Sequence, residues 1–244
     1  MSYNNSKFGY NRRDGVFSAG GSSLLDDLIS YWKLDEAAGV ARVDSAGSGN
    51  TLTDHNTVTT PAGIIEGSAG FNGTTQYLSV ASTVSLETGD ISYAFSAWLY
   101  PTDVSSLRTV MSKGEAGTSV EYVFYIDSAD GMLHCQVWND PPAANDQAIS
   151  LAPIPLNTWT HMVFMRNKAA VEVQLYINGV VQDNNAITIA PTAHSGDFNL
   201  SRYMFTGDRF FAGRIDEVGF WKRVLTTDEI AELYNGGTGL SYPF

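Results

Sequence analysis

Carboxylate side chains are the groups of this chain with the most obvious chemical potential, and their spacing argues against hydrolysis of a glycosidic bond. That reaction requires two carboxylates flanking the bond, about 5–5.5 Å apart in retaining enzymes and roughly 6.5–9.5 Å apart in inverting ones. Asp216 and Glu217 are adjacent in a strand-like run, and Asp35 and Glu36 follow another. Neighbouring residues of a strand point to opposite faces. We therefore expect no catalytic residues and predict that the protein is not an enzyme.

Histidine, cysteine and serine provide no alternative catalytic group. The histidines, His55, His134, His161 and His194, are widely separated and lack a paired spacing such as H-x-x-x-H. Cys135 is the only cysteine, which excludes an internal disulfide and a thiolate metal cluster, and we expect it to be a small buried residue. The sequence also lacks a G-x-S-x-G nucleophile motif and a G-x-x-x-x-G-K-[ST] phosphate loop.

Two loops instead combine an aromatic ring with polar side chains, the mixture that recognises sugars. An aromatic face packs on the apolar side of a sugar ring, while amides and carboxylates bind its hydroxyl groups. The candidate ligand-binding residues are Trp138, Asn139, Asp140, Asn145 and Asp146 in WNDPPAAND, and Arg202, Tyr203, Asp208 and Arg209 in SRYMFTGDR. For each loop the alternative stays open that the aromatic residue belongs to the core beside a solvated loop.

The composition suits a large β domain and narrows the range of partners. Charged residues make up 16% of the 244 residues, and glycine is abundant at 23, as in strands joined by many turns. The formal charge of −12 opposes binding to phosphate backbones, so we expect no nucleic acid partner. No run approaches the roughly 18 apolar residues of a membrane span, and the N-terminus lacks the apolar core of a secretory signal.

Short strands separated by turns account for most of the chain. Asp130–Gly131 and Asn178–Gly179 have the residue types that accept the positive φ of hairpin turns. Without helical crossovers, many antiparallel strands predict a sandwich or a closed barrel. The expected strands cover residues 29–34, 74–80, 91–100, 109–112, 120–126, 132–138, 158–166, 171–177 and 198–200.

Residues 211–237 change period halfway and position the carboxylate Asp216. The first half alternates like a buried strand, which places Asp216 among apolar residues. In the second half, Thr226 and Glu229 have the spacing of a capping box, and Leu225 and Ile230 that of a hydrophobic staple. The glycines at 236 and 237 then end the helix. A strand followed by a short C-terminal helix is therefore predicted.

The first 23 residues differ from the rest and are predicted to form a polar N-terminal arm ahead of a domain at 24–244. Such an arm, rich in Asn, Ser and Gly, lacks a periodic apolar pattern. We expect it to dock on neighbouring protein subunits of an assembly, the alternative being that it packs on its own domain. The candidate partner-binding residues are Phe8, Tyr10, Arg12, Arg13 and Phe17.

The order of segments resembles the laminin G-like, or concanavalin A-like, lectin and glucanase jelly rolls. The matching pieces span residues 28–237: ISYWKLDE, AGFNGTTQYLSV, FSAWLYP, VMSKG, LNTWTHMVFMR, LYINGVVQ and GRIDEVGFWKRVLTTDEIAELYNGG. The resemblance implies an all-β antiparallel sandwich (jelly roll) with one short C-terminal helix, in which the first strand lies beside the strand of Asp216. Members commonly bind glycans or proteins, and glucanase members carry an E-x-D-x-x-E pattern that this sequence lacks.

Many members of this family hold a structural Ca²⁺, and the resemblance places candidate ligands on this chain. The Asp of the G-x-I-D-E-V segment falls on Asp216, and the acidic loop after the first strand falls on Asp35 and Asp44. These three carboxylates are the predicted calcium ligands. The alternative is that Asp216 binds no metal and accepts hydrogen bonds from backbone N–H groups of that acidic loop.

Three functions from different classes are compatible with these observations. We expect a structural or adhesive protein of a large assembly, a bacteriophage virion component made in the host cytoplasm. The alternative is a free-standing carbohydrate-binding module that recognises cell-surface glycans, located in a bacterial cytoplasm or at a surface after release. The third is a glycoside hydrolase with a degenerate site.

Overall fold

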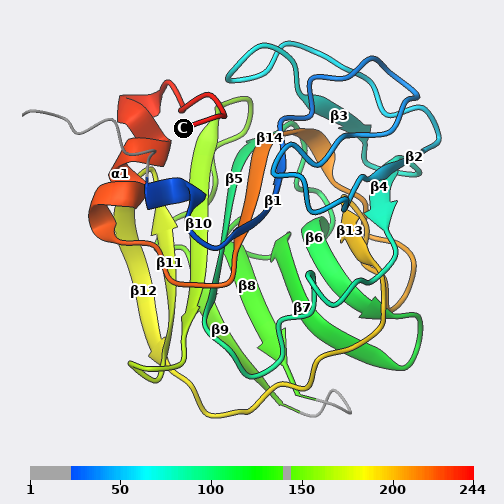
Figure 1. Ribbon diagram of the computed structural model, residues 1–244. Coiled ribbons are helices and arrows are strands. Elements are labelled where there is room, and N and C mark those ends of the chain that lie inside the picture. Colours follow the sequence, from blue (N-terminus) through cyan, green and yellow to red (C-terminus); the bar gives the residue numbers. More distant parts are fainter. Residues whose placement is uncertain (1–22, 140–143) are drawn as a thin grey trace, which may run out of the picture.

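A computed structural model describes residues 23–139 and 144–244 as two antiparallel sheets packed face to face (Figure 1). The first sheet has the order β1-β14-β5-β10-β11-β12, with β3 also pairing with β14. Its strands are β1 (Leu28–Trp32), β3 (Ala69–Asn72), β5 (Tyr93–Pro101), β10 (Thr160–Asn167), β11 (Glu172–Ile177), β12 (Val180–Ala186) and β14 (Ala212–Trp221). The predicted pairing of the first strand with the strand of Asp216 is confirmed.

The second sheet has the order β2-β4-β13-β6-β7-β8-β9. Its strands are β2 (Thr53–His55), β4 (Tyr77–Val80), β6 (Arg108–Glu115), β7 (Ser119–Ile126), β8 (Leu133–Trp138), β9 (Asn145–Ile149) and β13 (Phe198–Leu200). The strands at 53–55 and 145–149 were not expected from the sequence. Both are short edge strands with weak apolar alternation.

Side chains that alternate along the strands form the core between the sheets. Phe95 and Leu99 of β5 and Phe124 and Cys135 of the second sheet are buried there. Cys135 is thus the small buried residue expected, and burial raises the pKa of its thiol. The opposite faces of the same strands point away from this core.

A second apolar cluster covers the outer face of the first sheet. The helix α1 (Thr227–Tyr234) contributes Ile230 and Leu233, which pack with Met165 of β10. In Figure 1 the helix lies over β10 and β11, close to the C-terminus. The short 3₁₀ turn η1 (Ser23–Leu25) and the C-terminal residues join the same cluster, in which the rings of Tyr31 and Tyr242 stack 5.0 Å apart. A further 3₁₀ turn, η2 (Asn235–Gly237), follows α1.

The predicted helix start is confirmed. Thr226 Oγ1 accepts a hydrogen bond from Glu229 N at 3.2 Å, and Thr226 N donates to Glu229 Oε2 at 2.8 Å. Arg223 donates to both oxygens of the Glu229 carboxylate, at 2.7 and 2.9 Å. These bonds lower the pKa of Glu229 to about 2. The capping box is therefore also an ion pair that ties the helix to the end of β14.

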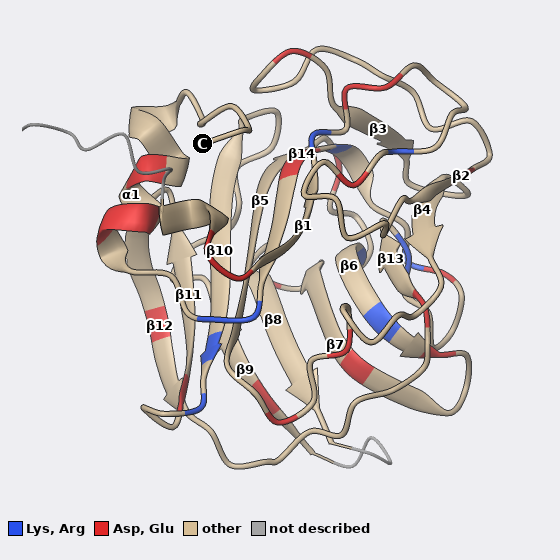
Figure 2. Ribbon diagram, viewed as in Figure 1, with Lys and Arg blue, Asp and Glu red and all other residues tan. Residues whose placement is uncertain are grey.

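A buried ion pair supports the second sheet. Lys113 Nζ of β6 donates to Glu121 Oε2 of β7 at 2.8 Å, and both side chains are fully buried. The pair corresponds to neighbouring blue and red bands on β6 and β7 in Figure 2. Glu121 Oε1 also accepts hydrogen bonds from the backbone N–H groups of Thr88 and Gly89 at 2.7 and 2.9 Å. The pair thus joins two strands to a connecting segment.

Side chains link the two sheets where their edge strands β9 and β12 meet. Ile149 N donates to Asp183 Oδ2 at 2.9 Å, and Asn185 Nδ2 donates to Gln147 O at 3.0 Å. Edge strands otherwise expose unpaired backbone groups that can recruit other chains. These bonds satisfy two backbone groups of the edge strand β9, Ile149 N and Gln147 O.

Candidate functional site

The outer face of the second sheet carries a groove with aromatic walls. Along β7 and β8, Tyr122, Phe124, Cys135 and Val137 face the core, so the alternating side chains face outward. The loop between β13 and β14 borders the same face. The residues that line the first hollow of the groove are Leu107, Thr109, Val123, Tyr125, Asp127, Gln136, Trp138, Tyr203 and Arg209, around a volume of about 150 Å³.

A second hollow of about 170 Å³ adjoins the first and is lined by Val120, Trp138, Tyr203 and Phe205. Trp138 and Tyr203 line both hollows. We call the two hollows together the aromatic groove. Two rings that come from positions 65 residues apart in the sequence thus border one continuous surface.

The loop that carries Tyr203 is fixed by hydrogen bonds to itself and to β6. Tyr203 N donates to Asp208 O at 3.0 Å, and Gly207 N donates to Tyr203 O at 2.8 Å, which closes a tight turn. Ser112 Oγ of β6 donates to Arg202 O at 2.7 Å. The Arg209 guanidinium lies 4.8 Å from the centre of the Tyr203 ring. Hydrogen bonds of the loop backbone and the Arg209 side chain therefore both hold the Tyr203 ring in place.

Two buried hydrogen-bonding atoms of the groove have no partner among the residues that the structure describes. They are Thr109 Oγ1 and Trp138 Nε1. Thr109 is fully buried, so its hydroxyl cannot be satisfied by open solvent. Nearly all buried polar atoms of folded proteins are paired, so these two atoms are unused hydrogen-bonding capacity beside the groove. Burial also raises the pKa of Tyr125 and of Tyr203, which keeps both phenols neutral and able to donate.

Among the candidate ligand residues, the structure brings Trp138, Tyr203 and Arg209 together in the first hollow. It places Asn145 directly opposite Trp138 in the β8–β9 ladder. Asn139 instead closes the β8–β9 connection, since its Oδ1 accepts from Ala144 N at 2.9 Å. Asp140 lies outside the described residues.

The remaining candidates in these loops have supporting contacts. The Arg202 guanidinium lies 4.6 Å from the centre of the Tyr77 ring, and Asp208 is an exposed residue of the tight turn. Asp146 is buried and accepts from Thr188 N at 2.9 Å and Ile189 N at 3.2 Å. Each of these three fixes the local chain, and none lines the aromatic groove.

Sequence reasoning missed several lining residues that lie within strands. Thr109, Tyr125 and Gln136 lie on β6, β7 and β8, and Phe205 lies on the loop beside Tyr203. The signal available was the alternation in LHCQVW, which places His134, Gln136 and Trp138 on one face. Gln136 Nε2 donates to Tyr125 Oη and to Gln147 Oε1, both at 3.1 Å. The floor of the groove is therefore an ordered polar row.

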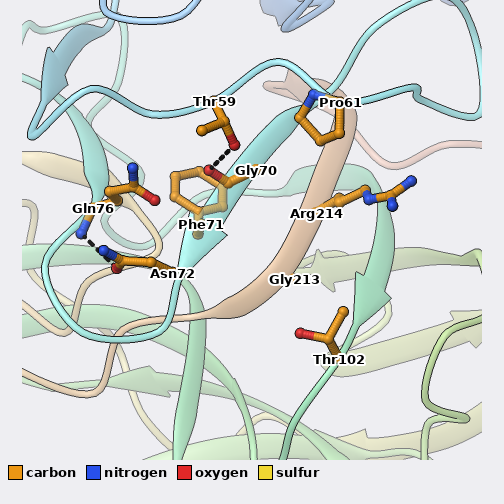
Figure 3. A pocket seen from close by; sticks show the side chains of 9 residues that line it. All are labelled: Thr59, Pro61, Gly70, Phe71, Asn72, Gln76, Thr102, Gly213 and Arg214. Carbon is orange, nitrogen blue, oxygen red and sulfur yellow. Dashed lines mark hydrogen bonds between the residues drawn. The ribbon is translucent and has the colours of Figure 1, made fainter.

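A larger pocket of about 340 Å³ lies at the edge of the first sheet, where β3 meets β14 (Figure 3). We call it the edge pocket. Its lining residues are Thr59, Pro61, Gly70, Phe71, Asn72, Gln76, Thr102, Gly213 and Arg214. Thr59 Oγ1 donates to Gly70 O at 3.0 Å, and Asn72 Oδ1 accepts from Gln76 N at 3.2 Å, as drawn in Figure 3. Arg214 donates to Ala62 O at 3.1 Å and stacks on Tyr100.

Asp216 is a buried hydrogen-bond hub on the outer side of the first sheet. Its Oδ2 accepts from Ile64 N at 2.8 Å and from Ile65 N at 3.3 Å. Burial, followed by the neighbouring Glu217 carboxylate, raises the pKa of Asp216 to about 9. The alternative to metal binding predicted donors from the acidic loop after the first strand. The donors instead come from the loop between β2 and β3.

A β-bulge changes the relation between Asp216 and Glu217. The register of β14 against β5 shifts between Asp216 and Gly219, and Glu217 adopts a φ of 48°. Ile215 and Val218 both face the core, so one residue too many lies between them for simple alternation. The expectation that Asp216 and Glu217 face opposite sides was therefore wrong. The bulge keeps both carboxylates out of the aromatic core, and burial raises the pKa of Glu217 to about 7.

The predicted calcium ligands do not form one site. Asp44 uses both carboxylate oxygens, accepting from Tyr31 N and Ala46 N at Oδ1 and from Ser30 Oγ and Asn50 N at Oδ2, all at 3.1 Å. Asp35 accepts from Gly67 N at 2.8 Å. The described residues contain no group of three acidic, histidine or cysteine side chains arranged for a metal ion. Asp35, Asp44 and Asp216 as joint ligands are therefore a wrong prediction for this part of the chain.

Calcium binding itself stays a prediction. A metal bound only by the native protein raises stability in proportion to RT ln(1 + [L]/Kd). Thermal unfolding with and without a chelator measures that difference directly.

The histidines His161 and His134 have structural roles, and the predicted arm residues lie outside the described part of the chain. His161 Nε2 lies 2.8 Å from Ser96 Oγ, and burial lowers the pKa of His161 to about 3, so the ring is neutral. His134 lies 3.0 Å from an oxygen of Asp130. The arm residues Phe8, Tyr10, Arg12, Arg13 and Phe17 lie outside the described residues, so docking of the arm stays a prediction. No helix in the described ranges is long and apolar enough to cross a membrane.

Comparison with known proteins identifies several similar chains. Over 78 residues the sequence is 30% identical to the Botulinum-like toxin eBoNT/J of an Enterococcus species, a match that covers 32% of this chain and 6% of the toxin. The binding domain of Paraclostridial Mosquitocidal Protein 1 has a TM-score of 0.70 at 17% identity, over 87% of this chain and 52% of that domain.

Domain 4 of AbnA, a GH43 extracellular arabinanase from Geobacillus stearothermophilus, was solved in complex with arabinotriose. It has a TM-score of 0.66 at 20% identity, over 88% of this chain and 98% of that domain. At these identities the structural matches establish the fold. The sequence model of the concanavalin A-like lectin/glucanases superfamily matches residues 72–231, from the end of β3 into α1, and the chain belongs to that superfamily.

Proposed function

We propose that this protein is a non-catalytic carbohydrate-binding domain whose site is the aromatic groove. The observation that carries the proposal is that Trp138 and Tyr203 line one groove, beside two polar atoms, Thr109 Oγ1 and Trp138 Nε1, for which residues 23–139 and 144–244 supply no partner. An aromatic face beside unpaired polar atoms suits a sugar ring, which has an apolar face and a rim of hydroxyl groups.

Each part of the groove has a role in that interaction. The Trp138 and Tyr203 rings would pack against the apolar faces of sugar rings. The Asp127 carboxylate and the Arg209 guanidinium would bind hydroxyl groups at the surface. The Thr109 hydroxyl and the Trp138 N–H are shielded from water in the free protein, so they would bind a hydroxyl group only when the side chains around them move apart. A donor left unpaired in the free protein loses little on binding, because no internal hydrogen bond has to be broken.

The groove does not support hydrolysis. Among the described residues that line it, Asp127 is the one carboxylate, whereas the two-carboxylate mechanism requires a pair. Asp216 and Glu217, whose raised pKa values would suit a proton donor, line neither the groove nor the edge pocket. A binding role therefore explains the arrangement better than a degenerate enzyme does.

The complex of AbnA domain 4 with arabinotriose supports the proposal by analogy, since that domain shares the fold over nearly its whole length. The structural and adhesive role in a phage virion stays a separate prediction. It rests on the arm, and deleting residues 1–23 should abolish incorporation into an assembly while the remaining domain stays folded. Unchanged assembly would contradict it.

A glycan array followed by calorimetric titration of each hit tests the function. We expect at least one oligosaccharide to bind and Trp138→Ala to abolish the signal. Trp159→Ala is the matched control, because Trp159 is a partly exposed tryptophan that lines neither hollow. Its ring lies 5.3 Å from that of Tyr100 in the first sheet, at an angle of 58°. An empty array, or equal losses in the two variants, would refute the proposal.

A further inference from the structure

The two hollows of the aromatic groove differ in chemical character. The first contains hydroxyl, carboxylate, amide and guanidinium groups, from Thr109, Asp127, Gln136 and Arg209. Beyond the shared Trp138 and Tyr203, the second is completed by Val120 and Phe205 alone. We call them the polar hollow and the apolar hollow.

The apolar hollow is a fixed part of the structure. Val120 is 4% exposed, at the start of β7. Phe205 O accepts a hydrogen bond from Gly117 N at 2.9 Å, which holds the loop against the turn between β6 and β7. The rings of Tyr203 and Phe205 lie 6.2 Å apart. Four apolar or aromatic side chains thus converge with no charged group among them.

A plain sugar ring does not use such a surface well. Its hydroxyl groups would lose hydrogen bonds to water on entering the apolar hollow and find no replacement. A methyl-terminated substituent gains free energy from the same burial, because the driving force is proportional to the apolar area removed from water. The polar hollow next to it remains available for the hydroxyl groups of the ring.

We propose that the aromatic groove is specific for sugars that carry a methyl-terminated substituent, with the ring in the polar hollow and the methyl group in the apolar hollow. This inference rests on the proposed function and adds the class of sugar. Two sources supply that chemistry, the N-acetyl group of an amino sugar and the C6 methyl group of a 6-deoxy sugar. Trp138 and Tyr203, at the junction, contact both parts of such a ligand.

Matched pairs of sugars test the inference. The first pair is the methyl glycosides of N-acetylglucosamine and glucose, and the second is those of L-fucose and L-galactose, each titrated against the full chain. In at least one pair we expect the methyl-bearing member to bind about fourfold more tightly or better, the effect of burying one methyl group. The pair that shows the preference identifies the source of the methyl group.

Two variants connect the preference to the apolar hollow. Phe205→Ala opens its wall and should bring the ratio of affinities within a pair close to one, because the methyl-bearing sugar loses more affinity than the plain sugar does. Val120→Thr keeps the shape of the side chain but adds a hydroxyl, and should reduce the same ratio. The thermal midpoint of each variant is measured first, so that a folding defect is recognised.

The outcomes separate this inference from the proposed function. Equal affinities within both pairs, with binding still abolished by Trp138→Ala, would overturn the methyl specificity and leave carbohydrate binding intact. A preference that survives in both Phe205→Ala and Val120→Thr would also overturn it. If no sugar of either pair or of the array binds, both conclusions fall.

Discussion

The aromatic groove and the edge pocket are two candidate sites on one domain. The groove carries the stronger functional signal, although each of its two hollows is smaller than the edge pocket. The edge pocket has about 340 Å³, whereas the hollows of the groove have about 150 and 170 Å³. In the edge pocket, Thr59 and Arg214 already donate to backbone carbonyl groups of the protein. In the groove, Thr109 Oγ1 and Trp138 Nε1 do not.

This difference shows that unused hydrogen-bonding capacity is more informative than size. The residues lining the edge pocket contribute no buried side-chain atom without a partner in the described structure. A ligand there would compete with bonds that already stabilise the fold. A ligand in the groove would complete bonds that the fold leaves open.

The largest expected effect comes from breaking the buried ion pair between Lys113 and Glu121, which supports the sheet that carries the groove. Lys113→Met leaves the buried Glu121 carboxylate without its cation, and losing one partner of a buried pair costs about 3–5 kcal/mol of stability. Urea unfolding measures the loss. Hydrogen exchange should show that β6 and β7 lose protection before β3 does.

The double variant Lys113→Met/Glu121→Gln is the control, because it removes the stranded charge. It should recover part of the stability. A uniform loss of protection over both sheets would show that the groove and the edge pocket share one cooperative unit.

Side-chain truncation in each hollow tests the comparison directly. Tyr203→Ala should weaken glycan binding by about 30-fold, since a central aromatic contact is typically worth about 2 kcal/mol. Arg214→Ala in the edge pocket should leave the affinity unchanged. Calorimetric titration of both variants with one glycan decides. A larger loss for Arg214→Ala would move the site to the edge pocket.

The pH dependence of stability separates the two outer faces of the sandwich. Asp216, which faces Glu217 and Asp35, has a pKa of about 9 in the folded protein and about 4 when unfolded, so the native state binds the extra proton between these values. Its contribution is complete below about pH 4 and is lost as the pH rises toward 9. Glu229 acts in the opposite sense, and its contribution is lost as the pH falls toward 2.

We therefore expect the free energy of unfolding to decrease between pH 5 and pH 8, by at most about 1.4 kcal/mol for each pH unit that the Asp216 proton accounts for. Denaturant titrations across this range measure the slope, and Asp216→Asn should flatten it. Glycan affinity should not follow the same curve, because the groove contains neither carboxylate. A slope unchanged in Asp216→Asn would contradict the assignment.

The smallest expected effect comes from the same substitution, threonine to valine, made once in the aromatic groove and once in the edge pocket. Thr109→Val removes a buried hydroxyl that has no partner, so stability should stay equal or rise, while glycan affinity falls about fivefold with the loss of one hydrogen bond. Thr59→Val removes a hydroxyl that donates to Gly70 O, so stability should fall by about 1 kcal/mol and affinity should not change. If Thr59→Val lowered the glycan affinity and Thr109→Val did not, the edge pocket would be the better candidate for the binding site.

Local patterns predicted the fold well. The alternation in β5, β8 and β11, the Asn178–Gly179 turn with φ values of 52° and 76°, and the capping box at Thr226 depend on neighbouring residues, and all are present. The bulge at Glu217 was not predictable in this way. It avoids placing a carboxylate in the aromatic core, a constraint that appears only when both sheets are present.

The groove was predictable only in fragments. Trp138 and Tyr203 were each selected because a ring stood beside polar residues, but their meeting depends on the order of the second sheet, in which β13 lies next to β6. Thr109 has no distinguishing sequence context, and its role follows from burial without a partner. Asp44 and Asp216 were assigned to one metal site by resemblance to the family, whereas each is occupied by its own hydrogen bonds.

The positions of the chain ends have a consequence for how the domain would be presented. Leu24 of η1 and the C-terminal Phe244 belong to the apolar cluster on the outer face of the first sheet, whereas the aromatic groove opens on the outer face of the second. An attachment made next to Leu24 or Phe244 would therefore leave the groove directed away from the anchoring surface. Copies arrayed on one support could then engage several glycans at once, and their combined avidity would exceed the affinity of a single groove.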